Sequence, residues 1–226
     1  MKRSGISRPW AVAGLVALAA GIAASLAGLE SVTRERIISN QAELVRRSLD
    51  ELLPPAGSFN NAPQLDVVGL RTAGALGSEE ALPAWRARLD GQAVAAILTV
   101  VAPDGYVDRI RLLVGITVDG RLLGVRVAAH RETPGLGDAI ETSRSAWIYG
   151  FDNRTLQGET RWALRRDGGD FDAITGATIT SRAVVDAVYS ALDYFSRNQA
   201  MIFSAPAKSN PARTIDPRPG NNDDQP

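Results

Sequence analysis

The sequence predicts an α+β fold, an antiparallel sheet with flanking helices, preceded by one N-terminal transmembrane helix. Three apolar runs separated by turn signals lie between residues 94 and 129, which is the pattern of a β-meander. A helical apolar stripe follows Ser181, and an uncharged run spans residues 10–29. The length of 226 residues fits one domain of about 100–200 residues with appendages.

The amino-terminal region predicts a single-pass membrane anchor. Residues 1–9 contain three basic residues, and the run 10–29 is uncharged, with about the twenty residues of a spanning helix. Because Lys and Arg are retained on the cytoplasmic side, we expect residues 1–9 in the cytoplasm and the main domain across the membrane. A cleaved signal peptide is the alternative, since Ala17-Leu18-Ala19 is similar to a cleavage triplet. The length of the apolar run favours retention.

Residues 30–93 are predicted to form a stalk helix and a connector. Apolar residues recur near helical spacing between residues 31 and 53, and Pro54-Pro55 ends the pattern. Residues 56–91 are rich in Gly, Pro and Ala with little periodicity. We therefore expect an irregular connection there, with a short helix around residues 81–89.

The main domain is predicted over residues 94–197 and begins with the meander. Its three strands are expected at 95–101, 110–118 and 122–128. Asp104-Gly105 and Asp119-Gly120 separate these runs, and glycine accepts the positive φ that tight hairpin turns require. A further strand pair is expected on either side of Asp167-Gly168-Gly169.

The carboxyl-terminal part of the domain is predicted to be a helix. Ser181 is the expected N-cap. The apolar stripe consists of Val184, Val185, Val188, Leu192 and Phe195. Residues 198–226 become rich in Pro, Asn and Asp, so they are predicted to form a disordered tail.

The composition excludes several classes of function. Basic and acidic residues balance at 25 each, so no broad positive field is available to bind nucleic acid. The absence of cysteine removes disulfides, thiol nucleophiles and iron–sulfur ligation. His130 is the one histidine, which leaves metal binding and Ser-His-Asp catalysis poorly supplied. We predict no metal site and no catalytic residue, so redox chemistry would require a cofactor.

The run from Asp172 to Ser181 is the most informative segment. It places the Thr178 hydroxyl on a turn of small residues just before the predicted helix, whose N–H groups favour a phosphate. Gly176 and Ala177 leave space around this hydroxyl, and Asp172 could position it or take its proton. Judged from the residues alone, ordinary helix capping explains the same pattern more often.

Longer motifs resemble a known family. The run Asp172–Thr178 fits the flavin-attachment signature Asp-x-x-Thr-Gly-Ala-Thr. The run His130–Asp138 is similar to a loop that faces the flavin, and Ala102–Tyr106 followed by Ile110–Ile116 is similar to a third segment. These motifs resemble the FMN-binding domain shared by the G subunit of Rnf-type ion-translocating electron transport complexes and the C subunit of sodium-translocating NADH:quinone reductases.

The resemblance implies a function for the chain as part of a translocase-type oxidoreductase, in which it carries electrons without a complete active site. It implies FMN joined through its phosphate to Thr178 by a separate flavin transferase that uses FAD. It also implies a location in the bacterial inner membrane, a periplasmic main domain, and partnership with other membrane subunits moving electrons between ferredoxin and NAD.

The remaining expected cofactor-binding residues belong to two of these motifs. They are Asp172, Thr175, Gly176, Ala177, Thr180, Ser181, His130, Glu132, Thr133, Gly135 and Leu136. This chain is shorter than is expected of the quinone-reductase type, and it contains the run Ile110–Ile116. Both features favour the Rnf type. A membrane-anchored assembly module without a cofactor is the alternative from another functional class.

Overall fold

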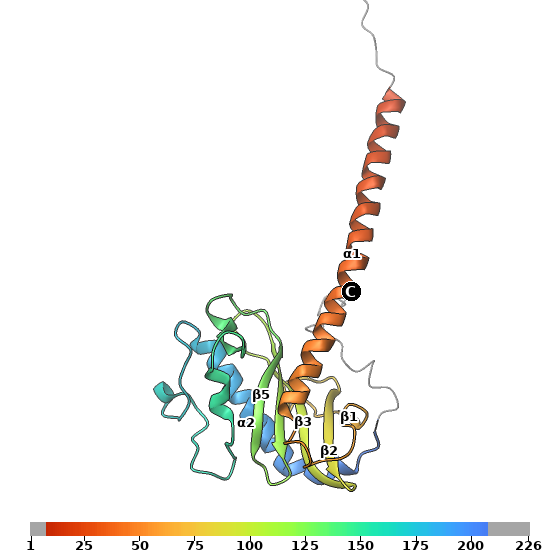
Figure 1. Cartoon of the computed structure of the whole chain (residues 1–226). Helices are drawn as coiled ribbons and strands as arrows, with labels where there is room; N and C mark the ends of the chain where they lie inside the picture. The colour runs from red at the N-terminus through yellow and green to blue at the C-terminus, as the bar shows by residue number, and fades with distance from the viewer. Residues whose placement is uncertain (1–7, 208–226) are drawn as a thin grey trace, which may run out of the picture. The chain divides into compact units, whose positions relative to one another are not determined.

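A five-stranded antiparallel sheet organises the folded body of the protein, with one long helix before it and another after it (Figure 1). The computed structural model describes residues 8–207. The chain divides into two compact units, Met1–Glu43 and Leu44–Pro226, and the sheet belongs to the second. The predicted α+β class is confirmed for this unit.

The strands of the sheet are β1 (Val67–Leu70), β2 (Leu82–Leu89), β3 (Gln92–Ala102), β4 (Ile110–Thr117) and β5 (Leu122–Ala129). The helices of the described residues are α1 (Arg8–Leu52), η1 (Gly137–Ile140), η2 (Trp147–Phe151), η3 (Arg165–Asp167) and α2 (Thr178–Ser204), of which the three η elements are 3-10 helices. The sheet order is β1-β2-β3-β4-β5, so each strand pairs with its neighbour in sequence.

The predicted meander is confirmed in strands β3, β4 and β5. Ile97 of β3 lies opposite Gly115 of β4, and Val114 lies opposite Val125 of β5. Gly120 closes the last hairpin with φ +81°, the conformation that the Asp-Gly signal anticipated.

The helix predicted around residues 81–89 is wrong, because this segment forms strand β2. Its alanines, leucines and arginines have good helix propensity, but pairing with β3 and burial override that preference. Asp90 and Gly91 form the turn from β2 to β3, with φ values of +50° and +81°. This is the same Asp-Gly signal that located the later hairpin, so the strand could have been found from the sequence.

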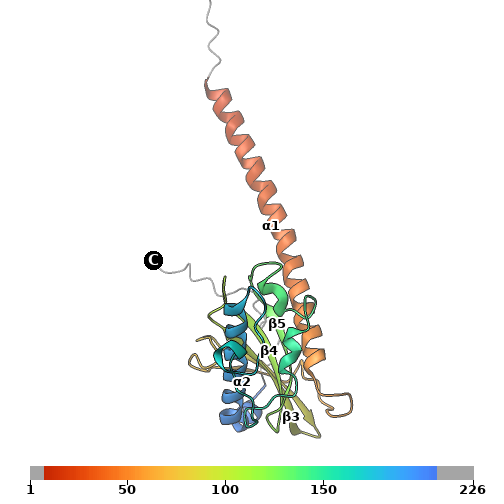
Figure 2. The same cartoon turned by 90° about the vertical axis from the view of Figure 1, so that its left-hand side faces the viewer.

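The two faces of the sheet bury two different helices. Alternate side chains such as Leu98 and Val114 pack with Val184 and Val188 of α2, which runs along one face (Figure 2). Side chains of the opposite parity pack with the last turns of α1, which ends at Leu52, before the two prolines that were expected to stop it. The period of two along each strand thus places α2 and the last turns of α1 on opposite faces of the sheet.

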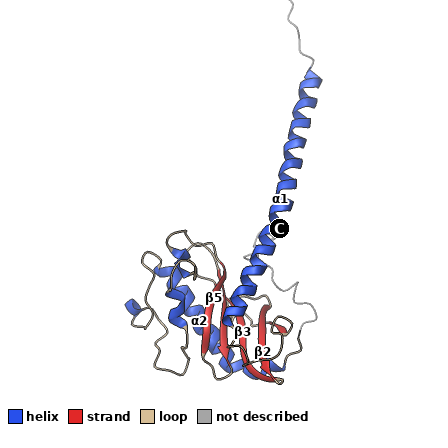
Figure 3. Ribbon diagram, viewed as in Figure 1, coloured by secondary structure: helices blue, strands red, loops and turns tan. Residues whose placement is uncertain are grey.

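Residues 130–177 connect β5 to α2 mainly through loops and short 3-10 helices (Figure 3). The strand pair predicted around Asp167-Gly168-Gly169 is wrong: the segment contains η3 and an isolated parallel bridge between Leu164 and Phe171. Gly169 approaches Ala163 so closely that a Cβ would lie 1.9 Å from the Ala163 carbonyl oxygen. The chain therefore folds back through a compact turn and leaves no room for two extended strands.

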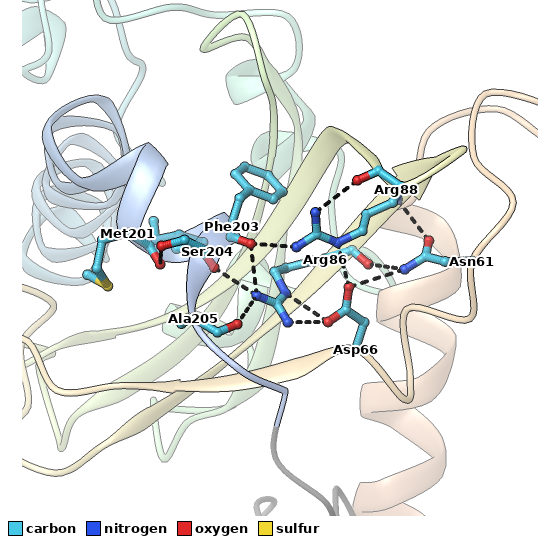
Figure 4. A network of polar contacts seen from close by, with 10 residues as sticks. Asn61, Asp66, Arg86, Arg88, Met201, Phe203, Ser204 and Ala205 are labelled. Atoms are coloured by element: carbon cyan, nitrogen blue, oxygen red, sulfur yellow. Dashed lines mark hydrogen bonds and ion pairs between the residues drawn. The ribbon is translucent and has the colours of Figure 1, made fainter.

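Helix α2 ends in a polar network that the sequence did not predict. Arg86 of β2 is 3% exposed and donates hydrogen bonds to carbonyl oxygens of the last helical turn and just beyond (Figure 4). These oxygens belong to Ile202 (3.1 Å), Phe203 (3.3 Å) and Ala205 (2.6 Å). Asp66 accepts from both Arg86 and Arg88, each through a guanidinium Nε at 2.9 Å. The network satisfies carbonyls that a helix end leaves unpaired.

The two ends of the chain carried further predictions. Among the residues that the structure describes in full, no helix is long and apolar enough to cross a membrane. Residues 198–204, expected in the tail, are helical, since α2 continues to Ser204 and buries Ile202 completely. Residues 208–226 of the predicted tail lie outside the described residues.

Candidate functional site

Helix α2 begins at Thr178, so the prediction of Ser181 as its N-cap is wrong. Ala177 is the N-cap, and no side chain caps the first turn. The buried Ser181 hydroxyl instead accepts the Ile174 N–H (2.9 Å) and donates to the Ala177 carbonyl (2.9 Å). Ser181 therefore folds the preceding turn onto the helix and leaves the first N–H groups to solvent or a ligand.

The turn before Thr178 requires glycine at position 176. Gly176 has φ +80°, a conformation that other residues adopt at a cost. A Cβ at this position would lie 2.9 Å from Cδ2 of Leu136. The two motifs that the sequence singled out separately, His130–Asp138 and Asp172–Thr178, are therefore in contact.

A buried carboxylate joins the same two motifs. Glu132 is 4% exposed, and its Oε2 accepts the Thr180 hydroxyl at 2.5 Å. Its Oε1 accepts the Val107 N–H at 3.1 Å, which adds the β3–β4 turn to the contact. Gly137 packs so closely that a Cβ there would be 2.8 Å from Glu132. Glu132 and Thr180 were expected to contact a cofactor, and the structure shows them bonded to each other.

The loop 130–138 is held in shape by its own hydrogen bonds. His130 Nδ1 accepts the Glu132 N–H (3.1 Å), and its Nε2 lies 2.8 Å from the Glu141 carboxylate. The Thr133 carbonyl accepts the Gly137 N–H at 3.0 Å. Gly135, at φ +79°, donates its N–H to the buried Asp138 at 2.8 Å. These bonds present Leu136 at the outer end of the loop.

Three consecutive residues of η3 contact the segment Asp172–Thr178 and the first turns of α2. The guanidinium of Arg165 pairs with Asp172 at 2.9 Å. Arg166 Nη1 lies 3.4 Å from Thr178 Oγ1, and Asp167 pairs with Arg182 at 2.6 Å. Sequence reasoning missed these arginines, although the pair Arg165-Arg166 directly before Asp-Gly-Gly could have indicated them. Asp172 was expected near the Thr178 hydroxyl, but its carboxylate is engaged by Arg165.

The charges around α2 differ in how far they are already neutralised. Burial raises the pKa of Asp186, one turn along α2 from Arg182, while Arg182 acts in the opposite direction and Asp104 and Asp167 add to the increase. Arg182 is thus already paired with Asp167. Arg166 forms no ion pair among the described residues, and its hydrogen bond goes to Thr178.

Comparisons with known proteins place the chain among flavin-binding and redox relatives. The family described as "FMN-binding domain" matches residues 105–193. A protein of Pseudomonas aeruginosa, named as the G subunit of an ion-translocating oxidoreductase complex, is 49% identical over 178 residues, which cover 78% of this chain and 83% of the relative. The G subunit of Shewanella loihica is 43% identical over 209 residues, covering 92% and 97%. That of Vibrio cholerae is 39% identical over 178 residues, covering 78% and 84%.

This chain belongs to the G-subunit family of Rnf-type ion-translocating oxidoreductase complexes. The resemblance that the sequence motifs indicated is confirmed, and the Rnf type is the one shown. The matched region 105–193 runs from the β3–β4 turn into α2, so it contains both contacting motifs and η3.

In this member of the G-subunit family, apolar side chains are exposed on the segments that meet at the motifs. Leu136 and Ile179 are 45% and 49% exposed, and Tyr106 and Val107 of the β3–β4 turn are 65% and 55% exposed. Trp147 Nε1 donates to the Asp172 carbonyl at 2.6 Å and fixes the other side of the motif. Within residues 8–207, no group of acidic or histidine side chains is arranged to hold a metal ion.

Proposed function

We propose that this chain is an electron-carrying flavoprotein subunit that holds FMN as a phosphoester on Thr178. It would relay electrons within an ion-translocating ferredoxin/NAD oxidoreductase complex. The observation that carries the proposal is the position of Thr178, the first residue of α2, with no side chain capping the helix and an arginine 3.4 Å from its hydroxyl. The names of the relatives and of the matched family support the same role.

The residues present fit a flavin phosphate and ring. Unpaired N–H groups at the start of a helix favour a phosphate, and Arg166 adds a positive charge beside the ester oxygen. Leu136 and Ile179 offer exposed apolar surface for a flat ring next to the attachment turn. FMN, when bound, supplies reversible electron transfer. The protein's part is to fix the phosphate and the ring, while Glu132 and Thr180 hold the two motifs together.

Membrane anchoring is part of the proposal and rests on the sequence. The uncharged run 10–29, with basic residues before it, supports an anchor in the inner membrane, a cytoplasmic amino terminus and a periplasmic main domain. The partners would be the other membrane subunits of the complex and, during maturation, a flavin transferase that uses FAD. A cofactor-free interaction module is disfavoured, because the matched family is an FMN-binding domain.

The mass of the intact full-length chain tests covalent attachment. Co-expressed with a flavin transferase, the wild-type chain should gain one FMN less one water. Thr178→Val should gain nothing, since valine has the shape of threonine but no hydroxyl. Thr142→Val is the matched control, because Thr142 is an exposed threonine outside the attachment signature, and it should be modified like the wild type. Modified Thr178→Val protein would refute the assignment.

A further inference from the structure

We propose that Arg166 is a positioning residue for flavin attachment: its guanidinium binds the phosphate that becomes joined to Thr178, during the transfer and afterwards. This inference rests on the proposed function and deepens it. It assigns to η3, which lies outside the attachment signature, the role of guiding the phosphoryl group to one hydroxyl. The inference is carried by three sets of contacts.

The first set concerns the placement of η3. Arg165 and Asp167 are fixed by ion pairs on either side of Arg166, to Asp172 at 2.9 Å and to Arg182 at 2.6 Å. The short helix is therefore attached at both ends to the segment that carries Thr178. Arg166, between these attachments, lies with Nη1 3.4 Å from Thr178 Oγ1.

The second set of contacts shows which positive charge near Thr178 is available to a ligand. Arg165 and Arg182 are already paired with carboxylates, whereas Arg166 forms no ion pair among the described residues. Its side chain is exposed, so an incoming donor can reach it. Of the three arginines around Thr178, Arg166 is the one whose guanidinium is free to bind an added anion.

The third observation is the distance from the Arg166 guanidinium to the oxygen atoms at Thr178. The distance of 3.4 Å between Arg166 Nη1 and the Thr178 hydroxyl is long for a hydrogen bond. Once phosphorus is bonded to Oγ1, however, its non-bridging oxygens extend beyond Oγ1, and a guanidinium fork binds such oxygens at about 2.7–2.9 Å. The present geometry thus suits the esterified threonine better than the free one.

The transfer balances with FAD as the donor. Thr178 Oγ1 attacks the phosphorus that carries the riboflavin group, and the Oγ1–P bond forms. The bond from this phosphorus to the bridging pyrophosphate oxygen breaks, AMP leaves with that oxygen, and the hydroxyl proton passes to a base of the transferase. No oxidation or reduction occurs. Arg166 would stabilise the negative charge that gathers on the phosphate oxygens as the new bond forms.

The test measures the initial rate at which purified full-length chain is flavinylated by an FAD-dependent transferase that modifies the wild type, followed by intact mass. Arg166→Gln should lower kcat roughly tenfold and leave the KM for the target chain nearly unchanged. Arg166→Lys should recover part of the rate, because it keeps the charge without the fork. Arg197→Gln is the charge-matched control. Arg197 is exposed near the other end of α2 from Thr178 and pairs with Asp193, so this variant should react like the wild type.

The outcomes separate this inference from the proposed function. An Arg166→Gln rate within about twofold of wild type would overturn the inference and leave the function standing. Equal slowing by Arg166→Gln and Arg197→Gln, or a loss confined to KM, would also overturn it, since either indicates general charge or docking. A wild-type chain that never gains flavin at Thr178 would refute the proposed function and the inference with it. Circular dichroism of each variant should match the wild type, because both arginines are exposed.

Discussion

Replacing Arg86 by Met should destabilise the folded body by about 3 kcal/mol, because a buried charge network loses its centre. Arg86 donates to three carbonyl oxygens at the end of α2 and to Asp66. Breaking a buried ion pair costs roughly 3–5 kcal/mol, and each polar group left unpaired roughly 1–3 kcal/mol. Asp66 keeps its bond to Arg88 and is 18% exposed. The expected loss of unfolding free energy therefore lies near the lower end of the range for a buried ion pair.

Urea unfolding of the full chain, followed by tryptophan fluorescence, would measure this loss. Hydrogen exchange should locate this loss at the last turns of α2, while exchange in the middle of the helix stays as slow as in the wild type. Helix α2 has 27 residues, so about 40 Å separate the network from Thr178, and flavin attachment should persist. Arg197→Met, at a 72% exposed site on the same helix, is the control and should cost well under 1 kcal/mol. A loss below about 1 kcal/mol for Arg86→Met would refute the reasoning.

Four further changes test other parts of the structure. Thr180→Val should separate the two motifs and shift the flavin reduction potential, whereas Thr180→Ser keeps the hydroxyl that Glu132 accepts and should behave like the wild type; equal potentials for both would make the bond irrelevant to the site. Gly176→Ala and its control Gly168→Ala both place alanine at a positive φ near +80°, at a cost of about 1–3 kcal/mol, but only the former meets Leu136 and should disturb the flavin. Burial raises the pKa of Asp152, so the carboxyl keeps its proton to higher pH in the folded chain than in the unfolded one. The contribution of Asp152 to the free energy of unfolding therefore falls as pH rises above the ordinary value of 3.8. Asp152→Asn should remove this fall when urea unfolding is measured across pH, and an unchanged slope would contradict the assignment. A periplasm-active reporter fused after Phe203 should give signal and a cytoplasm-active one none; the reverse pattern would overturn the proposed topology.

The sequence predicted those parts of the fold in which local signals and burial agree. Alternating apolar runs joined by Asp-Gly turns located β3 to β5, and the apolar stripe located α2. Strand β2 was missed because its residues favour a helix locally, although the Asp90-Gly91 turn signal that follows it was present in the sequence. The contacts of Arg86 with a distant helix end are of another kind, because no local pattern in the sequence reveals them.

The sequence likewise indicated some parts of the candidate site and not others. The motif around Thr178 and the loop around Leu136 were found because each is a run of specific residues in sequence. The mutual bond between Glu132 and Thr180 was not found, since both are polar residues in motifs expected to face a cofactor. Arg166 was missed because its significance depends on how η3 folds back beside α2, which the expected strand pair would have prevented.

The sequential order of the strands has a consequence for how the protein matures. Each strand of the sheet pairs with the one made just before it, so the sheet can form by local hairpins as the chain emerges. Closing these short loops has a low entropic cost. Helix α2 comes after all five strands and covers the sheet last. Thr178, the proposed acceptor, is the first residue of α2, and Arg166 of η3 contacts its hydroxyl only when the helix has docked. A transferase that recognises this arrangement would modify only chains whose folding is complete, so that flavin content would report the quality of folding in each molecule.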